Sequence, residues 1–186
     1  MNYSIILLGS DLKYLQDLST RLIESTKLEN VISIFDIRKQ FNNNKPAGEF
    51  FSQAMFYEKI ENSTDTNNII IPDDIINVKL NYLNDYVYFL PGMKFYLCIV
   101  KDKYKDYKDN FQTDKHHKRK YRISKELSSQ TVTDRVTYES KLDNIIYDDN
   151  RFKKLIIDKE EDIYNQYIKF TEFCVENNIK LIEEES

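Results

Sequence analysis

The segment that most constrains the fold lies at the N-terminus, where residues 4–13 read SIILLGSDLK. The apolar run Ile5–Leu8 has the length of a buried strand, Gly9 marks a turn, and Ser10 or Asp11 can cap a helix that follows. A strand, a glycine turn and a helix start in this order indicate the first unit of an α/β protein. In nucleotide-binding α/β proteins this is the place of the phosphate-binding loop.

The same segment lacks the residues that hold a phosphate in the common nucleotide-binding loop. That loop has the pattern G-x-x-x-x-G-K-[ST], in which the lysine contacts phosphate oxygens and the hydroxyl ligates Mg²⁺. Counted from Gly9, its last three positions hold Tyr14, Leu15 and Gln16, and Lys13 comes two residues early. The scaffold of such a loop is therefore expected without its usual chemistry.

Further along the chain, short apolar runs alternate with longer segments of helical periodicity. The predicted strands span residues 3–8, 31–35, 68–71, 94–100 and 153–157. The predicted helices span about 11–26, 47–61, 74–86, 126–147 and 160–177, the last with a buried face of Ile163, Tyr167, Phe170 and Cys174 or Phe173. This alternation predicts an α/β fold with a doubly wound, mainly parallel five-stranded sheet and helices on both faces.

Length and composition indicate one domain over residues 1–186, because 186 residues form one substantial core and no linker divides the chain. No apolar run is long enough for a membrane span. Cys98 and Cys174 lie in apolar segments and no leader is recognised, so we expect two buried thiols and a cytoplasmic location. The abundance of Asn, Lys, Ile, Asp and Tyr is typical of an AT-rich genome such as that of a phage or virus, which would place the protein in the host cytoplasm.

Residues of about 101–125 form a charged insertion with a basic block at Lys115–Arg122. The block could clamp phosphates as a lid, contact nucleic acid or form a solvated loop. The net charge of −4 argues against a general nucleic-acid binder. No ligand set for a metal is recognised: the adjacent His116 and His117 have no helical spacing and no nearby cysteine.

In order and spacing, these features resemble the thymidylate kinase group of P-loop nucleoside monophosphate kinases. The resemblance is carried by FDIR with KPAGE (residues 35–38 and 45–49), by IIIPDDI with LNY (69–75 and 80–82), by PGMKFYL (91–97), by DRV (134–136) and by KLIID (154–158). It implies a P-loop kinase-like fold, a lid at the basic insertion, and Mg²⁺ and ATP as cofactors only if the protein is catalytic. The resemblance also implies that Arg135 and Asp73 are the catalytic residues.

The candidate nucleotide- and phosphate-binding residues are Gly9, Ser10, Lys13, Arg38, Lys118, Arg119 and Arg122. Through the resemblance, Arg38 would hold the acceptor monophosphate and Arg135 with lid lysines would neutralise the transferred charge. Either arginine could instead form a surface ion pair, and Ser10 could simply cap a helix. Asp36, Asp73 and Asp74 follow predicted strands, where they could hold Mg²⁺ or accept a proton, while Asp74 could also cap the next helix.

One departure from the family pattern bears directly on activity. Where the family has Asp-Arg after the third strand, this chain has Asp73-Asp74, and a carboxylate repels the phosphate that an arginine would bind. With the altered loop, this predicts a weakly active or non-catalytic kinase homologue whose enzymatic status stays open. The alternatives are a regulatory module that pairs with a second copy or another protein, for instance through Phe50, Phe51, Phe56 and Tyr57, or a nucleic-acid-contacting accessory protein.

Overall fold

The computed structural model describes residues 2–9, 11–41, 46–75, 77–101, 140–148 and 151–182, without the side chains of Pro46, Leu80, Tyr86 and Val87. Five strands form a single sheet in these ranges: β1 Asn2–Leu8, β2 Asn30–Ser33, β3 Asn68–Ile71, β4 Met93–Lys101 and β5 Lys153–Asp158. Their order in the sheet is β2-β3-β1-β4-β5, and every neighbouring pair is parallel. The predicted α/β fold with a parallel five-stranded sheet is confirmed.

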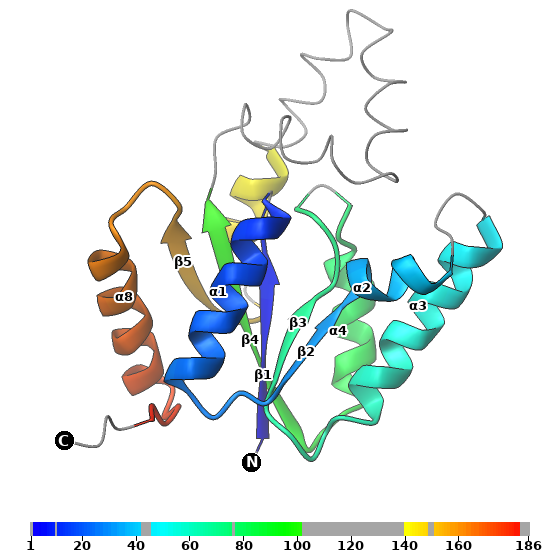
Figure 1. Ribbon diagram of the computed structural model, residues 1–186, viewed down its shortest axis with the longest axis horizontal. Helices are drawn as coiled ribbons and strands as arrows, with labels where there is room; N and C mark the ends of the chain where they lie inside the picture. The colour runs from blue at the N-terminus through cyan, green and yellow to red at the C-terminus, as the bar shows by residue number, and fades with distance from the viewer. Residues whose placement is uncertain are drawn as a thin grey trace, which may run out of the picture.

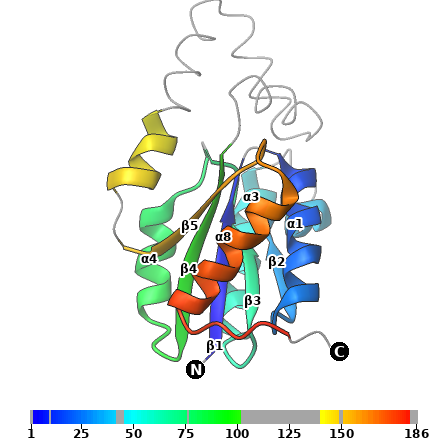
Figure 2. The ribbon, with the colours of Figure 1, turned by 90° about the vertical axis from the view of Figure 1, so that its left-hand side faces the viewer.

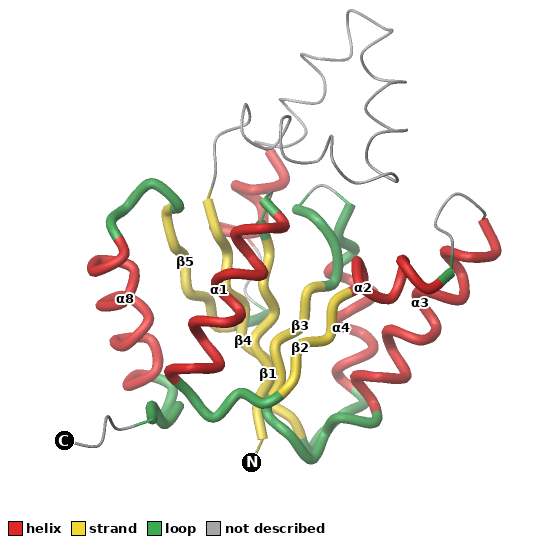
Figure 3. Tube along the Cα trace, viewed as in Figure 1, coloured by secondary structure: helices red, strands yellow, loops and turns green. Residues whose placement is uncertain are grey.

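The helices cover both faces of this sheet (Figures 1 and 2). They are α1 Leu12–Ser25, α2 Ile34–Gln40, α3 Pro46–Glu61, α4 Leu80–Tyr88, a short π-helix η1 Asn144–Asp148 and α8 Ile163–Glu176. Figure 2 places α1 and α4 on opposite faces, and Figure 3 places α2 and α3 beside the β2 edge. Because all strands point the same way, their carboxyl ends share one edge, where ligands bind in such sheets.

Strand β1 lies at the centre because it is apolar along both faces. Its residues Ile5–Leu8 are each at most 2% exposed, as expected for a parallel strand covered on two sides. Helix α1 packs on it through Leu15, Leu18 and Leu22, and the Asp11 carboxylate caps the helix by accepting from the Tyr14 amide at 3.1 Å. The predicted helix at 11–26 is therefore confirmed.

The second strand is shorter than predicted. Strand β2 ends at Ser33, whose hydroxyl accepts from the Phe35 amide at 3.3 Å and caps α2. The prediction that a strand continues to Phe35 is wrong, because a capping serine followed by Ile34, Phe35 and Ile37 gives a helix with a buried face. Asp36 consequently lies on an exposed part of α2, and not at a strand end.

Two helices also differ from their predictions. Helix α4 begins at Leu80 and not near residue 74, because the chain first makes a tight turn at Asp74. Helix α8 buries Gln166, Phe170, Phe173 and Cys174, whereas Ile163 and Tyr167 are exposed. The predicted helix at 126–147 lies outside the described residues except for 140–147, which are helical, and the charged insertion lies outside them beyond Lys101.

The core surrounds β1, β3 and β4 and includes both thiols. Cys98 and Cys174 are free and buried, as predicted. Burial raises the pKa of each thiol to about 12. In the described part of the chain, no helix is both long and apolar enough to cross a membrane.

Candidate functional site

The turn between β1 and α1 is shaped by close packing of the helix on the sheet. Gly9 is buried, and a methyl group at its α-carbon would lie 3.1 Å from Leu15 Cδ2 and 3.3 Å from Val100 Cβ. A methyl group there would require the Leu15 side chain or Val100 to move by a few tenths of an ångström. Packing alone is therefore sufficient reason for a glycine at this position.

Beyond the turn, polar contacts tie the start of α1 to the loop after β5. The Lys159 ammonium donates to Asp11 Oδ2 at 2.8 Å, and the Tyr14 hydroxyl donates to Gln166 Oε1 at 2.6 Å. The Gln166 amide in turn donates to the carbonyls of Glu161 at 2.9 Å and Asp158 at 3.2 Å. The Asp11 carboxylate thus lies at the amino end of α1, where the helix favours negative charge.

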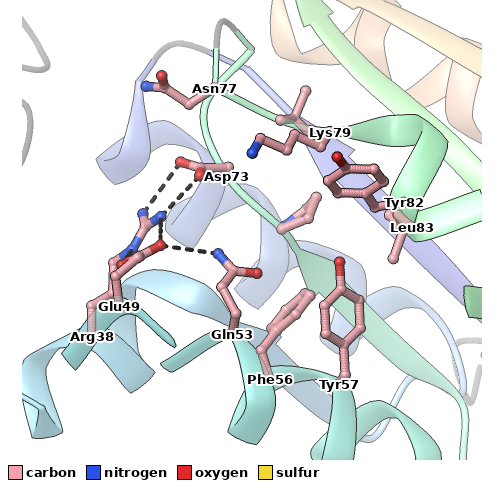
Figure 4. A pocket seen from close by; sticks show the side chains of 12 residues that line it. Arg38, Glu49, Gln53, Phe56, Tyr57, Asp73, Asn77, Lys79, Tyr82 and Leu83 are labelled. Atoms are coloured by element: carbon pink, nitrogen blue, oxygen red, sulfur yellow. Dashed lines mark hydrogen bonds and ion pairs between the residues drawn. The ribbon is translucent and has the colours of Figure 1, made fainter. Parts of the chain in front are cut away.

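A buried arginine joins three elements at the β3 side of the sheet (Figure 4). Arg38, from the last turn of α2, is 2% exposed. Its Nε and Nη2 donate to the two oxygens of Glu49 at 2.9 and 2.7 Å, and Nη1 and Nη2 donate to those of Asp73 at 3.2 and 2.9 Å. Four of the five N–H groups of this guanidinium therefore bind protein carboxylates.

This cluster follows from local structure. The Ser33 cap sets the direction of α2, α3 begins at Pro46 and puts Glu49 in its first turn, and Asp73 follows the end of β3. Burial pulls the Arg38 pKa down, but the hydrogen bonds to Glu49 and Asp73 outweigh it, so the pKa lies above its ordinary value. Loss of one partner would leave the buried guanidinium with a single carboxylate and cost about 3 kcal/mol, the lower end of the range for a broken buried pair.

Asp74 organises the turn that leads to α4. It is fully buried, its Oδ1 accepts from the Asn77 amide at 2.9 Å, and its Oδ2 accepts from Asn77 Nδ2 at 2.6 Å. Its own amide donates to Asp73 Oδ1 at 2.9 Å. The prediction that Asp74 caps the following helix is wrong. Asp74 caps a turn that comes before α4, and α4 itself begins at Leu80.

Beside Arg38 lies a cavity of about 420 Å³ between α3, α4 and the loop after β3, here called the Arg38 pocket. Its lining comprises Arg38, Glu49, Gln53, Phe56, Tyr57, Pro72, Asp73, Asn77, Val78, Lys79, Tyr82 and Leu83. Figure 4 shows Phe56, Tyr57 and Tyr82 on one side of it and the charged cluster on the other. The pocket therefore combines aromatic surface, side-chain amides and one exposed ammonium, that of Lys79.

A second cavity of about 350 Å³ adjoins it, here called the Lys141 pocket. It is lined by Val78, Lys79, Asn81, Tyr82, Lys141, Asn144, Ile145 and Arg151. Val78, Lys79 and Tyr82 line both cavities, so the two share a wall. The Lys141 ammonium donates to the Val78 carbonyl at 2.6 Å and Arg151 donates to Asn81 Oδ1 at 2.6 Å.

Of the predicted site residues, the structure brings together Arg38 and Asp73, and it adds Glu49 to them. Gly9 lies at the distant β1 turn, and Lys13 is exposed on α1. Asp36 is exposed and pairs with Lys39 at 3.8 Å. The candidates at Ser10, Lys118, Arg119, Arg122 and Arg135 lie outside the described residues.

Several residues of the two pockets were not singled out by the sequence pattern. Gln53 could have been, because it follows Glu49 by one helical turn and donates to it at 3.0 Å. Lys79, Lys141 and Arg151 carry no such signal. They come together only because the helical segment at 140–148 packs near the start of α4.

Comparison with known proteins gives a structural likeness only. No protein-family model matches the chain, and no curated protein matches it. Among solved structures, a gluconokinase from Sinorhizobium meliloti 1021 aligns over 95% of this chain and 93% of its own, with a TM-score of 0.49 and 8% sequence identity. A likeness at this level assigns neither a family nor an activity.

Proposed function

We propose that this chain is a nucleotide-binding protein on a nucleotide-kinase-like scaffold, and that it does not transfer phosphoryl groups. The ligand is a nucleoside or nucleoside monophosphate, thymidylate-like by the resemblance, whose base enters the Arg38 pocket. Mg²⁺ and ATP are no part of this function.

One observation carries the non-catalytic part of the proposal: the Asp11 carboxylate lies at the start of α1, where a phosphate-binding loop would hold a phosphate. Asp11 accepts from the Tyr14 amide and from Lys159, so one amide at the helix start and this lysine already have a carboxylate as partner. A triphosphate there would meet negative charge and would have to displace both contacts. Tyr14 and Leu15 also add bulk where such a loop needs glycine and lysine, so these residues do not fit Mg-ATP.

The Arg38 pocket supports the ligand class. Its volume lies in the range of small-molecule sites, which are mostly apolar with a few placed polar groups. The Tyr57 and Tyr82 rings provide a surface for a planar base, and Gln53 and Asn77 can donate to and accept from its edge. Hydrophobic ring contact and a hydrogen-bonding rim are the features that a nucleobase requires.

Thermal shift confirmed by calorimetry tests the proposal, because a ligand that binds only the folded state raises its stability. We expect thymidine or another deoxynucleoside, or its monophosphate, to raise the melting temperature, Mg-ATP to leave it unchanged, and a coupled kinase assay to show no turnover. Stabilisation by Mg-ATP, with turnover that is lost in Arg135→Ala, would replace the proposal by an active kinase.

A matched pair of variants locates the ligand. Tyr82 and Tyr88 are both exposed on α4, at 63% and 81%, but only Tyr82 lines the Arg38 pocket. Tyr82→Ala should weaken nucleoside binding about tenfold by removing a ring contact, and Tyr88→Ala should not. Equal effects of the two variants would place the ligand elsewhere.

A second candidate function is a protein-interaction module, and one observation favours it. On α3, Phe50 and Phe51 are 70% and 54% exposed, while Phe56 is buried in the core. Phe51 stacks with Phe41 at 6.3 Å between ring centroids, which forms an aromatic surface patch beside the β2 edge. Patches of this kind occur at protein interfaces. Loss of self-association or partner binding in Phe50→Ser would support this function.

A further inference from the structure

The walls of the Lys141 pocket are cationic. Lys79, Lys141 and Arg151 line it together with Asn81 and Asn144, and none of its described lining residues is a carboxylate. Lys79 comes directly before α4, and Asn81 lies in the first turn of that helix. The amino end of a helix adds a partial positive charge to the same space. This set of cations, amide donors and a helix end is suited to an oxyanion.

The groups are also held in place. The Lys141 ammonium is half-buried and anchored on the Val78 carbonyl, Arg151 is held by the Asn81 side chain, and the Lys79 ammonium lies over the Tyr82 ring at 5.4 Å. The pKa of Lys141 is lowered first by burial, while Asp74 and Asp73 raise it and Lys79 lowers it further.

The Arg38 pocket, by contrast, receives a phosphate poorly at its arginine. Arg38 already binds Glu49 and Asp73, so a phosphate at this guanidinium would face two carboxylates and would have to break buried ion pairs. The shared wall of Val78, Lys79 and Tyr82 offers another route. A charged group beside Lys79 and Tyr82 in the Lys141 pocket would therefore adjoin a ring held in the Arg38 pocket.

We propose that the phosphate group of the bound nucleotide lies in the Lys141 pocket, on Lys79, Lys141 and Arg151, and not on Arg38. This inference rests on the proposed nucleotide-binding function and names the phosphate subsite within it. In this arrangement Arg38 holds α2, α3 and the loop after β3 together and does not bind the ligand. One nucleotide occupies both pockets. The ligand spans them with its base against the aromatic side chains and its charge beside η1.

The test compares a nucleoside with its monophosphate in wild type, Arg151→Gln and Lys153→Gln. Arg151 and Lys153 are both exposed cations near the start of β5, but Lys153 does not line the pocket. By calorimetry, wild type should bind the monophosphate more tightly than the nucleoside. Arg151→Gln should reduce that advantage about fivefold, since exposed charge pairs contribute up to about 1 kcal/mol, and Lys153→Gln should leave it unchanged.

Raising the salt concentration should reduce the same advantage, because partly exposed charges are screened. An advantage of the monophosphate that is equal in all three proteins would overturn the subsite. If neither ligand binds, the proposed function fails, and pyrophosphate alone is then the probe. If pyrophosphate stabilises wild type but not Arg151→Gln, the Lys141 pocket is an anion site that does not take a nucleotide. If pyrophosphate stabilises both proteins or neither, the anion site is overturned.

Discussion

At the level of single residues, the Arg38 cluster makes a prediction about stability. Asp73→Asn removes one of the two carboxylates that pair with the Arg38 guanidinium, which is 2% exposed. Because Glu49 remains as a partner, we expect a loss near the lower end of the range for a broken buried pair, about 3 kcal/mol. Urea denaturation at pH 7 measures it.

Asp36→Asn is the matched control. Asp36 is also an aspartate paired with a cation, Lys39, but both side chains are mostly exposed and the pair is 3.8 Å long. A surface pair of this kind contributes less than about 1 kcal/mol. If both substitutions cost the same, the Arg38 cluster does not hold α2, α3 and the loop after β3 together.

The buried thiol of Cys98 predicts how stability depends on alkaline pH. Burial raises its pKa from 9.0 to about 12, so the folded protein keeps a proton that the unfolded chain loses above pH 9. The stabilisation is therefore complete below pH 9 and is lost between pH 9 and 12, at about 1.4 kcal/mol per pH unit. In Cys98→Ala, the free energy of unfolding measured across this window should fall less steeply with pH, by about 1.4 kcal/mol per pH unit. An unchanged slope would mean that the thiol is not buried.

At the level of elements, the contact of α1 with the sheet depends on Gly9. In Gly9→Ala the new methyl group would lie 3.1 Å from Leu15 Cδ2 and 3.3 Å from Val100 Cβ, and Leu15 is 1% exposed with little room to move. Overpacking of this kind costs about 1–3 kcal/mol. Equilibrium denaturation should show this loss.

Gly92→Ala provides the comparison, because nothing lies within 4 Å of its added methyl group. Its effect should stay within about 0.5 kcal/mol. Truncation of the neighbour in Gly9→Ala/Leu15→Ala should show a favourable coupling between the two substitutions. Equal costs at Gly9 and Gly92, or no coupling, would show that close packing is not the reason for the glycine at the β1 turn.

Element types were largely predictable, whereas their ends depended on single polar side chains. Apolar runs and helical stripes identified all five strands, and β3 was predicted with its observed bounds. The errors arose where a side chain caps the backbone: Ser33 starts α2 early, and Asp74 delays α4 by closing a turn. On α8, Gln166 replaces an expected apolar contact because it binds loop carbonyls, a role that periodicity does not reveal.

At the level of the whole molecule, the sequence located only part of the candidate site. Arg38 and Asp73 were both selected, but their mutual pairing was not foreseen, since 35 positions separate them in the chain. The cations of the Lys141 pocket come from segments as distant as residues 79 and 151. Only the crossover connections of the sheet bring such groups together, and a single sequence carries no pattern for them.

The topology predicts how the molecule unfolds. Strand β1 pairs with β3 on one side and β4 on the other, so no half of the sheet can separate without breaking its ladder, whereas β2 and β5 lie at the edges. We expect the amides of Ile5–Leu7 to exchange hydrogen only through global unfolding, with an opening free energy equal to that from denaturation. The amides of β2 should exchange with a lower opening free energy.

In Gly9→Ala the opening free energy of the β1 amides should fall by the full loss of stability, because α1 and β1 belong to one cooperative unit. Exchange of β1 at a lower free energy, or unaffected by Gly9→Ala, would mean that the sheet unfolds in two independent parts and that residues 1–186 are not a single domain.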